Sequence, residues 1–322
     1  MSAGSANGPR PVNLRQDIPQ ILKLLELVFG KSIGAEGRRM LSSNLALSLK
    51  PAPFWRLSPD IGKLSLGYVW EEDGVVIANA TVLNTKMAGR YLVVNVAVHP
   101  DFRQQGIARG LMETIITSLR AQDAKEILLQ VEAENVPAIN LYNSLAFNSL
   151  GTMNSWRTTV SRLRAVQEYS YGQYKPRLRK LHRNEWQAAY ELDLTCLKPE
   201  LNWPEALPID IFRRGIWHMI DKFVNGRQSE AWVIVDTNNQ MLALNGIWSE
   251  WGRAHRVSLR ILPEWRGKLE RQLLANTVHR LRYLPRRNIR LDHPADDEIM
   301  NQLLQDANFS VNKTLTHMRL ML

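Results

Sequence analysis

At 322 residues, the chain can bury one large core or two ordinary ones, because single domains commonly hold ~100–200 residues. Hydrophobic residues make up 45% of the chain and charged residues 22%, the balance of a globular protein. No uninterrupted apolar run approaches the ~20 residues that span a bilayer. Cys196 is the only cysteine, which excludes an intrachain disulfide and a cysteine-rich metal site. We therefore expect a cytoplasmic protein without a membrane anchor, in which Cys196 is a packed thiol and no metal is bound.

The net charge of +10 raises the question of nucleic-acid binding. Residues 1–165 carry 18 basic and 13 acidic side chains, and residues 166–322 carry 23 and 18, so the surplus is divided evenly. The one concentrated basic block, "RLRYLPRRNIR" at 280–290, is typical of a solvated helix end and loop. An even surplus suits small anions or solubility as well as it suits a polyanion. A nucleic-acid partner is therefore the least favoured class.

The first half predicts an alternation of short strands and helices. Residues 1–10 are small and polar, as in a disordered leader, and a strand is expected at 12–15. Apolar side chains recur at helical spacing from Ile18 to Val28, which predicts a helix over 17–29. The remaining predictions are a helix at 38–49, strands at 64–70 and 75–83 joined by a turn at 71–74, a strand at 91–98, a helix from 107 to about 121, a strand at 126–132 and a helix at 136–145.

The second half repeats this order. Pro100 and Arg103 recur as Pro263 and Arg266, and Phe147 recurs as Phe309. The elements predicted there are a strand at 176–181, helices at 184–195 and 210–224, strands at 231–236, 241–248 and 255–262, a helix at 267–283, a strand at 288–292 and a helix at 296–306. We expect an α+β fold with a domain over 11–165 and a second over 166–322, each a mixed, mostly antiparallel sheet flanked by helices.

The stretch "VAVHPDFRQQGIARGLMETII" at 96–116 passes from a strand to a helix. A helix N-terminus presents unpaired N–H groups and favours anions. The small residues Gly106 and Ala108 allow a bulky phosphate to approach these groups, and Arg103 and Arg109 add positive charge. The stretch therefore predicts a pyrophosphate site. "FGKSIG" at 29–34 is not a nucleotide-binding P-loop, because Leu25 stands where that motif requires glycine.

The run Arg103-Gln104-Gln105-Gly106-Ile107-Ala108 resembles the R/Q-x-x-G-x-G/A signature of the GCN5-related N-acetyltransferases, the GNAT family. Further on, "NVPAINLYNSLAF" is similar to the family's N-x-x-A-x-x-x-Y…F ending, with Asn135, Ala138, Tyr142 and Phe147 at the matching positions. The order of elements also agrees along the first half, and the second half resembles the same fold. The resemblance implies two tandem GNAT-like domains and acetyl-CoA as cosubstrate.

The resemblance also implies roles for individual residues. The loop from Arg103 to Arg109, that is Arg103, Gln104, Gln105, Gly106, Ile107, Ala108 and Arg109, would hold the pyrophosphate of acetyl-CoA. The strand at 94–98 would splay from its neighbour, so that the Val96 N–H polarises the thioester carbonyl and Val98 pairs with the pantetheine amides. Tyr142 would protonate the departing thiolate, and Asn135 would contact the coenzyme arm. Two alternatives stay open: Tyr142 as a structural tyrosine of an amphipathic helix, and Asn135 as a helix N-cap before Pro137, a role that can coexist with binding.

The general base is missing from this pattern. The positions that carry a basic side chain in various family members fall on Leu92, Val94 and Gln130, none of which can accept a proton from an amine. Glu132 lies two residues beyond Gln130 on the same strand face and is our candidate base. A solvated glutamate at a strand end is the alternative, and His99 is a weaker candidate.

The second half departs from the family's binding motif. Leu269, Glu270 and Arg271 stand where the first half has Gly106, Ile107 and Ala108, while Leu304 and Asp297 replace Tyr142 and Asn135. Bulky side chains and a carboxylate would crowd and repel a pyrophosphate. We therefore expect the second domain not to bind acetyl-CoA. Two of its tryptophans, Trp203 and Trp251, are candidates to line an acceptor pocket or an interdomain seam.

These observations predict an acetyl-CoA-dependent N-acetyltransferase that acts by direct attack of a primary amine, with its chemistry in the first domain. The acceptor would be a small-molecule amine or a peptide N-terminus. The alternative is a non-catalytic acetyl-CoA-binding or scaffold protein with the same fold, which the missing base favours and the intact loop opposes.

Overall fold

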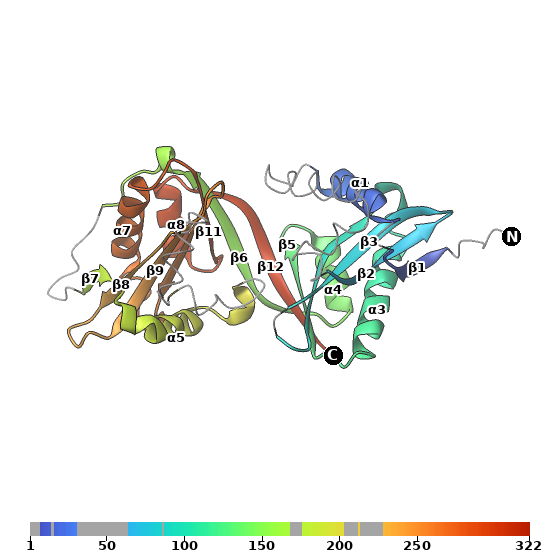
Figure 1. The fold of residues 1–322 in the computed structure, drawn as a ribbon, viewed down its shortest axis with the longest axis horizontal. Helices are drawn as coiled ribbons and strands as arrows, with labels where there is room; N and C mark the ends of the chain where they lie inside the picture. Colours follow the sequence, from blue (N-terminus) through green and yellow to red (C-terminus); the bar gives the residue numbers. More distant parts are fainter. Residues whose placement is uncertain are drawn as a thin grey trace. The chain divides into compact units, whose positions relative to one another are not determined.

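A computed structural model describes residues 7–13, 16–30, 64–85, 87–167, 176–202, 212 and 228–322. Contacts divide the chain into two compact units (Figure 1): unit 1 holds residues 1–130, 136–149 and 318–322, and unit 2 holds residues 131–135 and 150–317. The helices are α1 (Ile18–Phe29), α3 (Ile107–Arg120), α4 (Val136–Ser144), α5 (Trp186–Cys196), α7 (Glu270–Arg282) and α8 (Glu298–Asp306). The strands are β1 (Gly8–Pro11), β2 (Leu64–Glu72), β3 (Val75–Asn84), β4 (Arg90–Val98), β5 (Glu126–Glu132), β6 (Asn148–Thr159), β7 (Arg177–Lys180), β8 (Gln228–Val235), β9 (Met241–Ser249), β10 (His255–Ile261), β11 (Asn288–Pro294) and β12 (Ser310–Met321).

Most predicted elements are confirmed, often to within three residues at each end. The first strand is a correction: it covers Gly8–Pro11 rather than 12–15, so the predicted leader 1–10 is too long at its end. The side chain of Arg10 explains the shift, because its guanidinium donates to the carboxylates of Glu71 on β2 (2.6 Å) and Asp17 (2.7 Å). The predicted helices at 38–49 and 210–224 lie outside the described residues.

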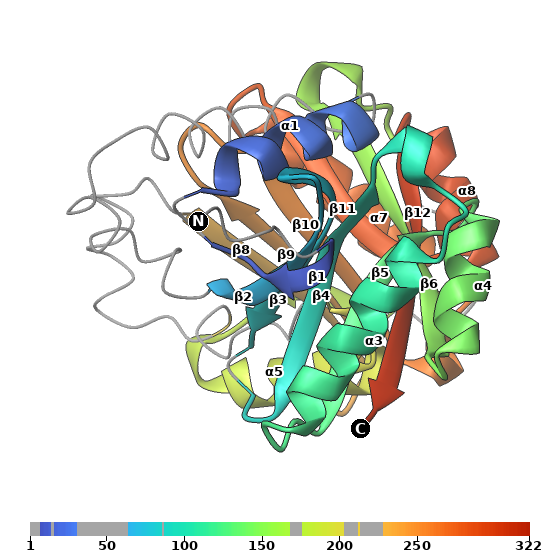
Figure 2. The ribbon, with the colours of Figure 1, turned by 90° about the vertical axis from the view of Figure 1, so that its right-hand side faces the viewer.

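Unit 1 is a sheet with helices on both faces (Figures 1 and 2). The strands follow the order β1-β2-β3-β4-β5, and the end of β12 pairs beyond β5. On one face, Leu24 and Leu25 of α1 pack on Val69 of β2. On the other face, Gly110 of α3 lies so close to the ring of Trp70 that a Cβ there would sit 2.8 Å from the ring. Because Val69 and Trp70 are adjacent in β2, they point to opposite faces, and each face receives its own helix.

Unit 2 repeats this architecture. Its strands follow the order β12-β6-β11-β10-β9-β8-β7. The α5 face is closed by a core that includes Ala189, Val233 and Leu244, and the opposite face by a core of α7 and α8 that includes Ile234 and Leu273. Alternation along β8 again divides Val233 and Ile234 between the two faces.

The last strand of each sequence repeat, β6 or β12, extends into the other unit. β6 follows α4 in the chain, yet residues Met153–Thr159 pair with β11 in unit 2. The equivalent strand of the second repeat, β12, ends in unit 1, where the N–H of Leu322 donates to the carbonyl of Lys125 (3.0 Å). Neither β6 nor β12 was predicted from the sequence. Both are rich in Asn, Ser and Thr, so they carry a weak apolar alternation.

The exchange predicts that the end of β12 stabilises unit 1. Leu320 is 4% exposed, whereas its neighbour Met321 is 59% exposed. We expect Leu320→Ala to lower the free energy of unfolding by about 2–4 kcal/mol, because it leaves a cavity in the core. Met321→Ala is the matched control, with a change within about 0.5 kcal/mol. Chemical denaturation measures both, and equal losses in the two variants would contradict the assigned place of this strand.

Candidate functional site

A bulge interrupts β4 in unit 1. Asn79 of β3 pairs with Ala97, but Thr81 pairs with Val94, so β4 contains one extra residue between these pairs. Asn95 lies at this point with a φ of 55°, in the left-handed region. The side chain of Asn79, which is fully buried, donates from Nδ2 to the carbonyl of Asn95 (3.0 Å) and so holds the bulge in place. Asn79 and Asn95 were not among the residues predicted to form the site, because a bulge of this kind leaves no pattern in the sequence.

At the bulge, β4 separates from β5. The parallel ladder between them ends at Val93 and Leu129, although β4 continues to Val98 and β5 to Glu132. The splay implied by the family resemblance is therefore present. Among the described strands, none pairs with this side of β4 from Val94 to Val98. The backbone of Val96 and Val98 thus lies on an edge that an extended, amide-containing ligand can pair with.

The loop after β4 leads into the N-terminus of α3. It passes through a short 3-10 helix, Pro100–Phe102, and then through Gln104 and Gly106, whose φ angles are 62° and 77°. Among the described residues, no side chain caps the first turn of α3, and apart from its chain neighbours no heavy atom lies within 4 Å of the position a Cβ would take at Gly106. Ile107 is buried and anchors the helix, while Ala108 is half-buried. The first-turn N–H groups therefore face an open space that a phosphate can enter.

The two arginines of this loop differ in the contacts that their side chains make. Arg103 is exposed and makes one long contact, from Nε to the carbonyl of Val98 (3.4 Å). Arg109 donates to the hydroxyl of Ser144 on α4 (2.6 Å) and lies 3.5 Å from Glu113. Gln105 contacts the backbone of the loop itself. Arg103 is thus available to an anion, while Arg109 also joins α3 to α4.

Tyr142 lies on α4 and is 6% exposed. Its ring packs against Phe147 at 5.8 Å between centroids. Burial raises the pKa of the hydroxyl to about 12, so the group keeps its proton across the neutral range. The hydroxyl makes no hydrogen bond with any residue in the described part of the chain. Tyr142 therefore carries a protonated hydroxyl that donates to no described residue, so it can donate its proton to a ligand.

Glu132, Asn135 and His99 have defined contacts. The Glu132 carboxylate lies 3.3 Å from the ammonium of Lys313 on β12, and the carbonyl of Glu132 accepts from the N–H of Asn135 (2.9 Å). Glu132 therefore has a cationic partner on β12. Nδ1 of His99 accepts from the N–H of Asp101 (3.4 Å), so this nitrogen caps the 3-10 helix. The role of Glu132 as base stays a prediction.

The corresponding helix in unit 2 is closed to anions. Leu269, which replaces Gly106, is buried, and Glu270 is 2% exposed. The Glu270 carboxylate accepts from the N–H of Gly267 (2.7 Å), so a negative group of the chain itself already occupies the helix N-terminus. Burial raises the pKa of this carboxyl despite these backbone hydrogen bonds. In addition, β10 pairs with β9 without a bulge.

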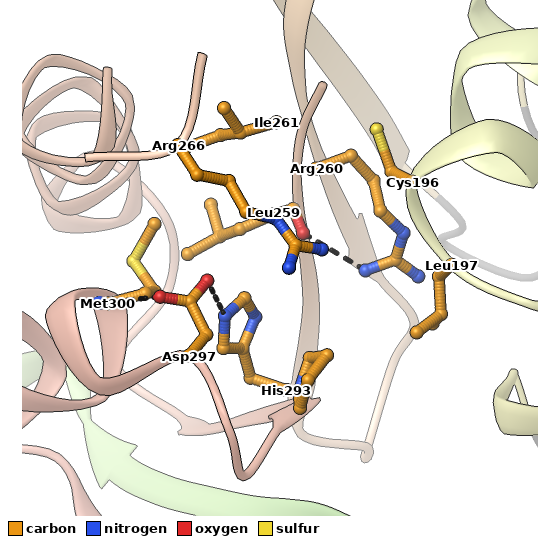
Figure 3. A pocket seen from close by; sticks show the side chains of 10 residues that line it. Cys196, Leu197, Leu259, Arg260, Ile261, Arg266, His293, Asp297 and Met300 are labelled. Atoms are coloured by element: carbon orange, nitrogen blue, oxygen red, sulfur yellow. Dashed lines mark hydrogen bonds and ion pairs between the residues drawn. The ribbon is translucent and has the colours of Figure 1, made fainter. Parts of the chain in front are cut away.

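The space between the separating strands of unit 2 is filled by an ionic network (Figure 3). The buried Arg260 donates from Nε to Asp193 (2.6 Å), and Nε2 of His293 lies 2.9 Å from Asp297. The cavity left between these groups measures about 10 Å³, which admits one water molecule. Cys196 lines it, and burial raises the pKa of its thiol to about 12, which agrees with the prediction of a packed, unreactive cysteine.

The comparisons with known proteins agree with this division. Residues 44–147 match the family model described as the acetyltransferase (GNAT) family. This segment is a GNAT domain. Over 66 residues the chain is 40% identical to the ribosomal protein bS18-alanine N-acetyltransferase of Escherichia coli, a match that covers 20% of this chain and 45% of that protein. Over 65 residues it is 37% identical to an N-alpha-acetyltransferase of Saccharolobus solfataricus, covering 20% of this chain and 39% of that protein. The chain thus spans less than half the length of these curated relatives.

Two solved structures share the fold along nearly the whole chain. The GCN5-related N-acetyltransferase from Sphaerobacter thermophilus superposes with a TM-score of 0.60 at 16% identity, covering 97% of this chain and 95% of that one. A tandem GNAT protein from the clavulanic acid biosynthesis pathway superposes with a TM-score of 0.53 at 13% identity, covering 98% of each. The architecture is therefore that of a tandem GNAT protein.

Two further predictions from the sequence concern the tryptophans Trp203 and Trp251 and a membrane anchor. Trp203 lies outside the described residues, and Trp251 is 69% exposed at the turn between β9 and β10. Within the described ranges, none of the helices has the length and apolar character needed to cross a membrane.

The opening at α3 predicts the effect of a side chain at Gly106. Gly106 and Gly74, at the β2–β3 turn, have similar φ angles of 77° and 81°, and at neither would an added methyl group have a heavy atom within 4 Å. Both alanine variants therefore carry the same backbone strain. We expect Gly106→Ala to weaken coenzyme A binding about tenfold, because the methyl group enters the space in front of the helix. Gly74→Ala should bind as the wild type does in isothermal titration, and equal weakening would contradict the site.

From the bulge we predict that two buried asparagines, Asn79 and Asn245, differ in their effect on coenzyme A binding. Asn79 and Asn245 are both fully buried in the middle of a strand, but Asn245 donates to Thr277 of α7 (2.6 Å) rather than to a bulge. Replacing either with alanine removes a buried hydrogen bond and should cost about 1–3 kcal/mol of stability. Only Asn79→Ala should also weaken coenzyme A binding. Calorimetry measures both properties, and unchanged binding by Asn79→Ala would contradict the role of the bulge.

Proposed function

We propose that the chain is an acetyl-CoA-dependent N-acetyltransferase whose chemistry takes place in the first predicted domain, residues 11–165, by direct attack of a primary amine. One observation carries the proposal: the unpaired edge of β4 beyond the bulge leads directly to the uncapped N-terminus of α3. An edge of backbone amides suits the pantetheine arm, and a helix N-terminus suits the pyrophosphate.

The residues present fit acetyl-CoA. The first-turn N–H groups of α3, opened by Gly106 and Ala108, would hold the pyrophosphate, with Arg103 as the available cation. Gln104 and Gln105 shape the loop, and Ile107 fixes the helix to the core. Val98 would pair with the amides of the arm, and Asn135 would contact the arm from the start of α4.

Two groups of the chain act on the reacting atoms in this proposal. Acetyl-CoA supplies an activated thioester carbonyl, and attack by an amine develops negative charge on its oxygen. The N–H of Val96, next to the bulge, would donate to that oxygen, and one fixed donor of this kind contributes about 3–4 kcal/mol. Tyr142 would donate its proton to the departing thiolate. With a pKa raised to about 12, Tyr142 is protonated in essentially every molecule at neutral pH.

The attacking amine must lose a proton, and we propose Glu132, acting through water, as the acceptor. Its carboxylate is about half exposed and lies beside Lys313, so water can reach it. The alternative base, His99, is less suited, because its Nδ1 already accepts a backbone hydrogen bond.

The acceptor is a primary amine, and a peptide or protein N-terminus is the class that we favour. The relatives from Escherichia coli and Saccharolobus solfataricus are named for alanine N-acetylation of a ribosomal protein and for N-alpha-acetylation. A small-molecule amine is the other acceptor that the assay should include. We further propose that unit 2 does not bind acetyl-CoA, because Glu270 occupies its helix N-terminus. The cytoplasm remains our predicted location.

Tyr142→Phe tests the assignment of the acid. It removes only the hydroxyl and keeps the ring contact with Phe147, so we expect kcat to fall about 10²–10³-fold while the KM for acetyl-CoA changes little. Release of the coenzyme A thiol, measured with a panel of peptides and small amines, gives both constants. Because the pKa lies near 12, loss of the Tyr142 proton should not lower the wild-type rate up to about pH 9.

Tyr91→Phe, at the start of β4, is the control and should retain wild-type kinetics. Tight binding of acetyl-CoA without turnover on any amine would instead establish the non-catalytic, scaffold alternative. A wild-type kcat for Tyr142→Phe would remove Tyr142 from the mechanism.

A further inference from the structure

Three arginines stand in a row across neighbouring strands of unit 2. Arg256 of β10 is in register with Arg290 of β11, and Arg290 is in register with Arg157 of β6. Residues in register point to the same face of a sheet, with strands about 4.8 Å apart. All three side chains are exposed. We call these residues the arginine row.

The arginine row does not stabilise the fold. Like charges directly opposite one another in a sheet repel and are destabilising. Arg290 has one acidic neighbour, Asp292, at 3.6 Å. Within the described part of the chain, the guanidinium groups of Arg157 and Arg256 make no hydrogen bond or ion pair. The three guanidinium groups therefore lie near one another, and Asp292 is their one acidic neighbour among the described residues. The row can thus still attract an external anion.

A polar cavity of about 320 Å³ continues the arginine row at the β6 side. Arg157 belongs to both, and Thr159 and Asn288 are the next pair in register on the same face. Arg162 adds a second exposed cation to the lining. The other lining residues are Thr158, Asn308 and Ser310. The cavity thus offers guanidinium, hydroxyl and amide groups, all of which bond to phosphate or to the polar edges of bases.

Two exposed aromatic rings lie at the same end of these strands. Trp251 precedes the start of β10, Tyr283 precedes the start of β11, and each is 69% exposed. The two segments are tied together, because Arg287 donates to the carbonyl of Glu250 (2.5 Å). Exposed rings at this end of the strands are suited to stacking with unpaired bases.

We propose that this end of unit 2 binds single-stranded nucleic acid, with phosphates along the arginine row and bases against the polar cavity and the exposed rings. The guanidinium fork matches phosphate geometry, and an extended row suits a chain of phosphates better than one small anion, which needs convergent groups. The sequence made a nucleic-acid partner the least favoured class, because the surplus charge is divided evenly along the chain. The fold gathers arginines from distant positions onto one face.

The test is fluorescence anisotropy of a labelled single-stranded RNA of about 15 nucleotides, titrated with the full-length protein at several salt concentrations. The row variant replaces Arg157, Arg256 and Arg290 with glutamine. We expect its affinity to fall at least tenfold, and the slope of log affinity against log salt to decrease in magnitude by about 2, since each phosphate contact on a single strand contributes about 0.7. Single-stranded DNA of the same sequence, run in parallel, identifies the preferred sugar.

The matched control replaces three exposed arginines outside the row, Arg120, Arg177 and Arg183, and so makes the same change in net charge. It should retain wild-type affinity and slope. Equal weakening in the control, tighter binding of poly-glutamate than of RNA, or duplex binding as tight as single-strand binding would each overturn the proposal. The thermal midpoint of the row variant should not fall below that of the wild type, because it loses the repulsion between the arginines and only one exposed ion pair, that of Arg290 with Asp292. Its acetylation of a small amine should be unchanged, so this test is independent of the proposed enzymatic function.

Discussion

The candidate site depends on one buried hydrogen bond, from the side chain of Asn79 to the backbone carbonyl of Asn95. A regular β4 would bond to β3 along its length, whereas the bulge at Asn95 turns the strand where it separates from β5. The same side chain also destabilises the fold. Oδ1 of Asn79 is buried and has no hydrogen-bond partner among the described residues, which lowers the stability by about 1–3 kcal/mol. A strand that only had to be stable would carry an apolar residue there. Asn79 instead fixes the point from which the unpaired amides of Val96 and Val98 begin.

The same fold in unit 2 shows what happens when these constraints change. Asn245 bonds to Thr277 of α7, the strands β9 and β10 stay in register, and Arg260 and Asp193 occupy the space between β10 and β11. At the helix N-terminus, the carboxylate of Glu270 takes the place of an external anion. A helix N-terminus favours a negative partner in either case. In unit 2 this partner is part of the chain, and in unit 1 the described residues supply no side-chain cap.

Much of this could be predicted from the sequence, because the signals are local. The loop from Arg103 to Ala108, the apolar strands and the repeat are each visible over short stretches, and they led to the correct fold class. The bulge and the strand exchange were not visible. A bulge depends on which residue of β3 faces which residue of β4, and β6 and β12 have polar sequences whose pairing partners are far away in the chain. The base is still the prediction made from the sequence, Glu132, because its role depends on how an acceptor lies in the site.

The strand exchange connects the two proposals. β6 follows α4 of the first repeat in the chain, but it lies beside β11 of the second, and this pairing places Arg157 next to Arg290. If β6 had remained in the sheet of its own repeat, Arg256 and Arg290 would form a pair without a third cation, and the polar cavity would lose Arg157, Thr159 and Arg162. An even distribution of charge along the sequence therefore says little about its distribution on the surface. The exchange brings Arg157 into register with Arg290 and Arg256 on one face of unit 2.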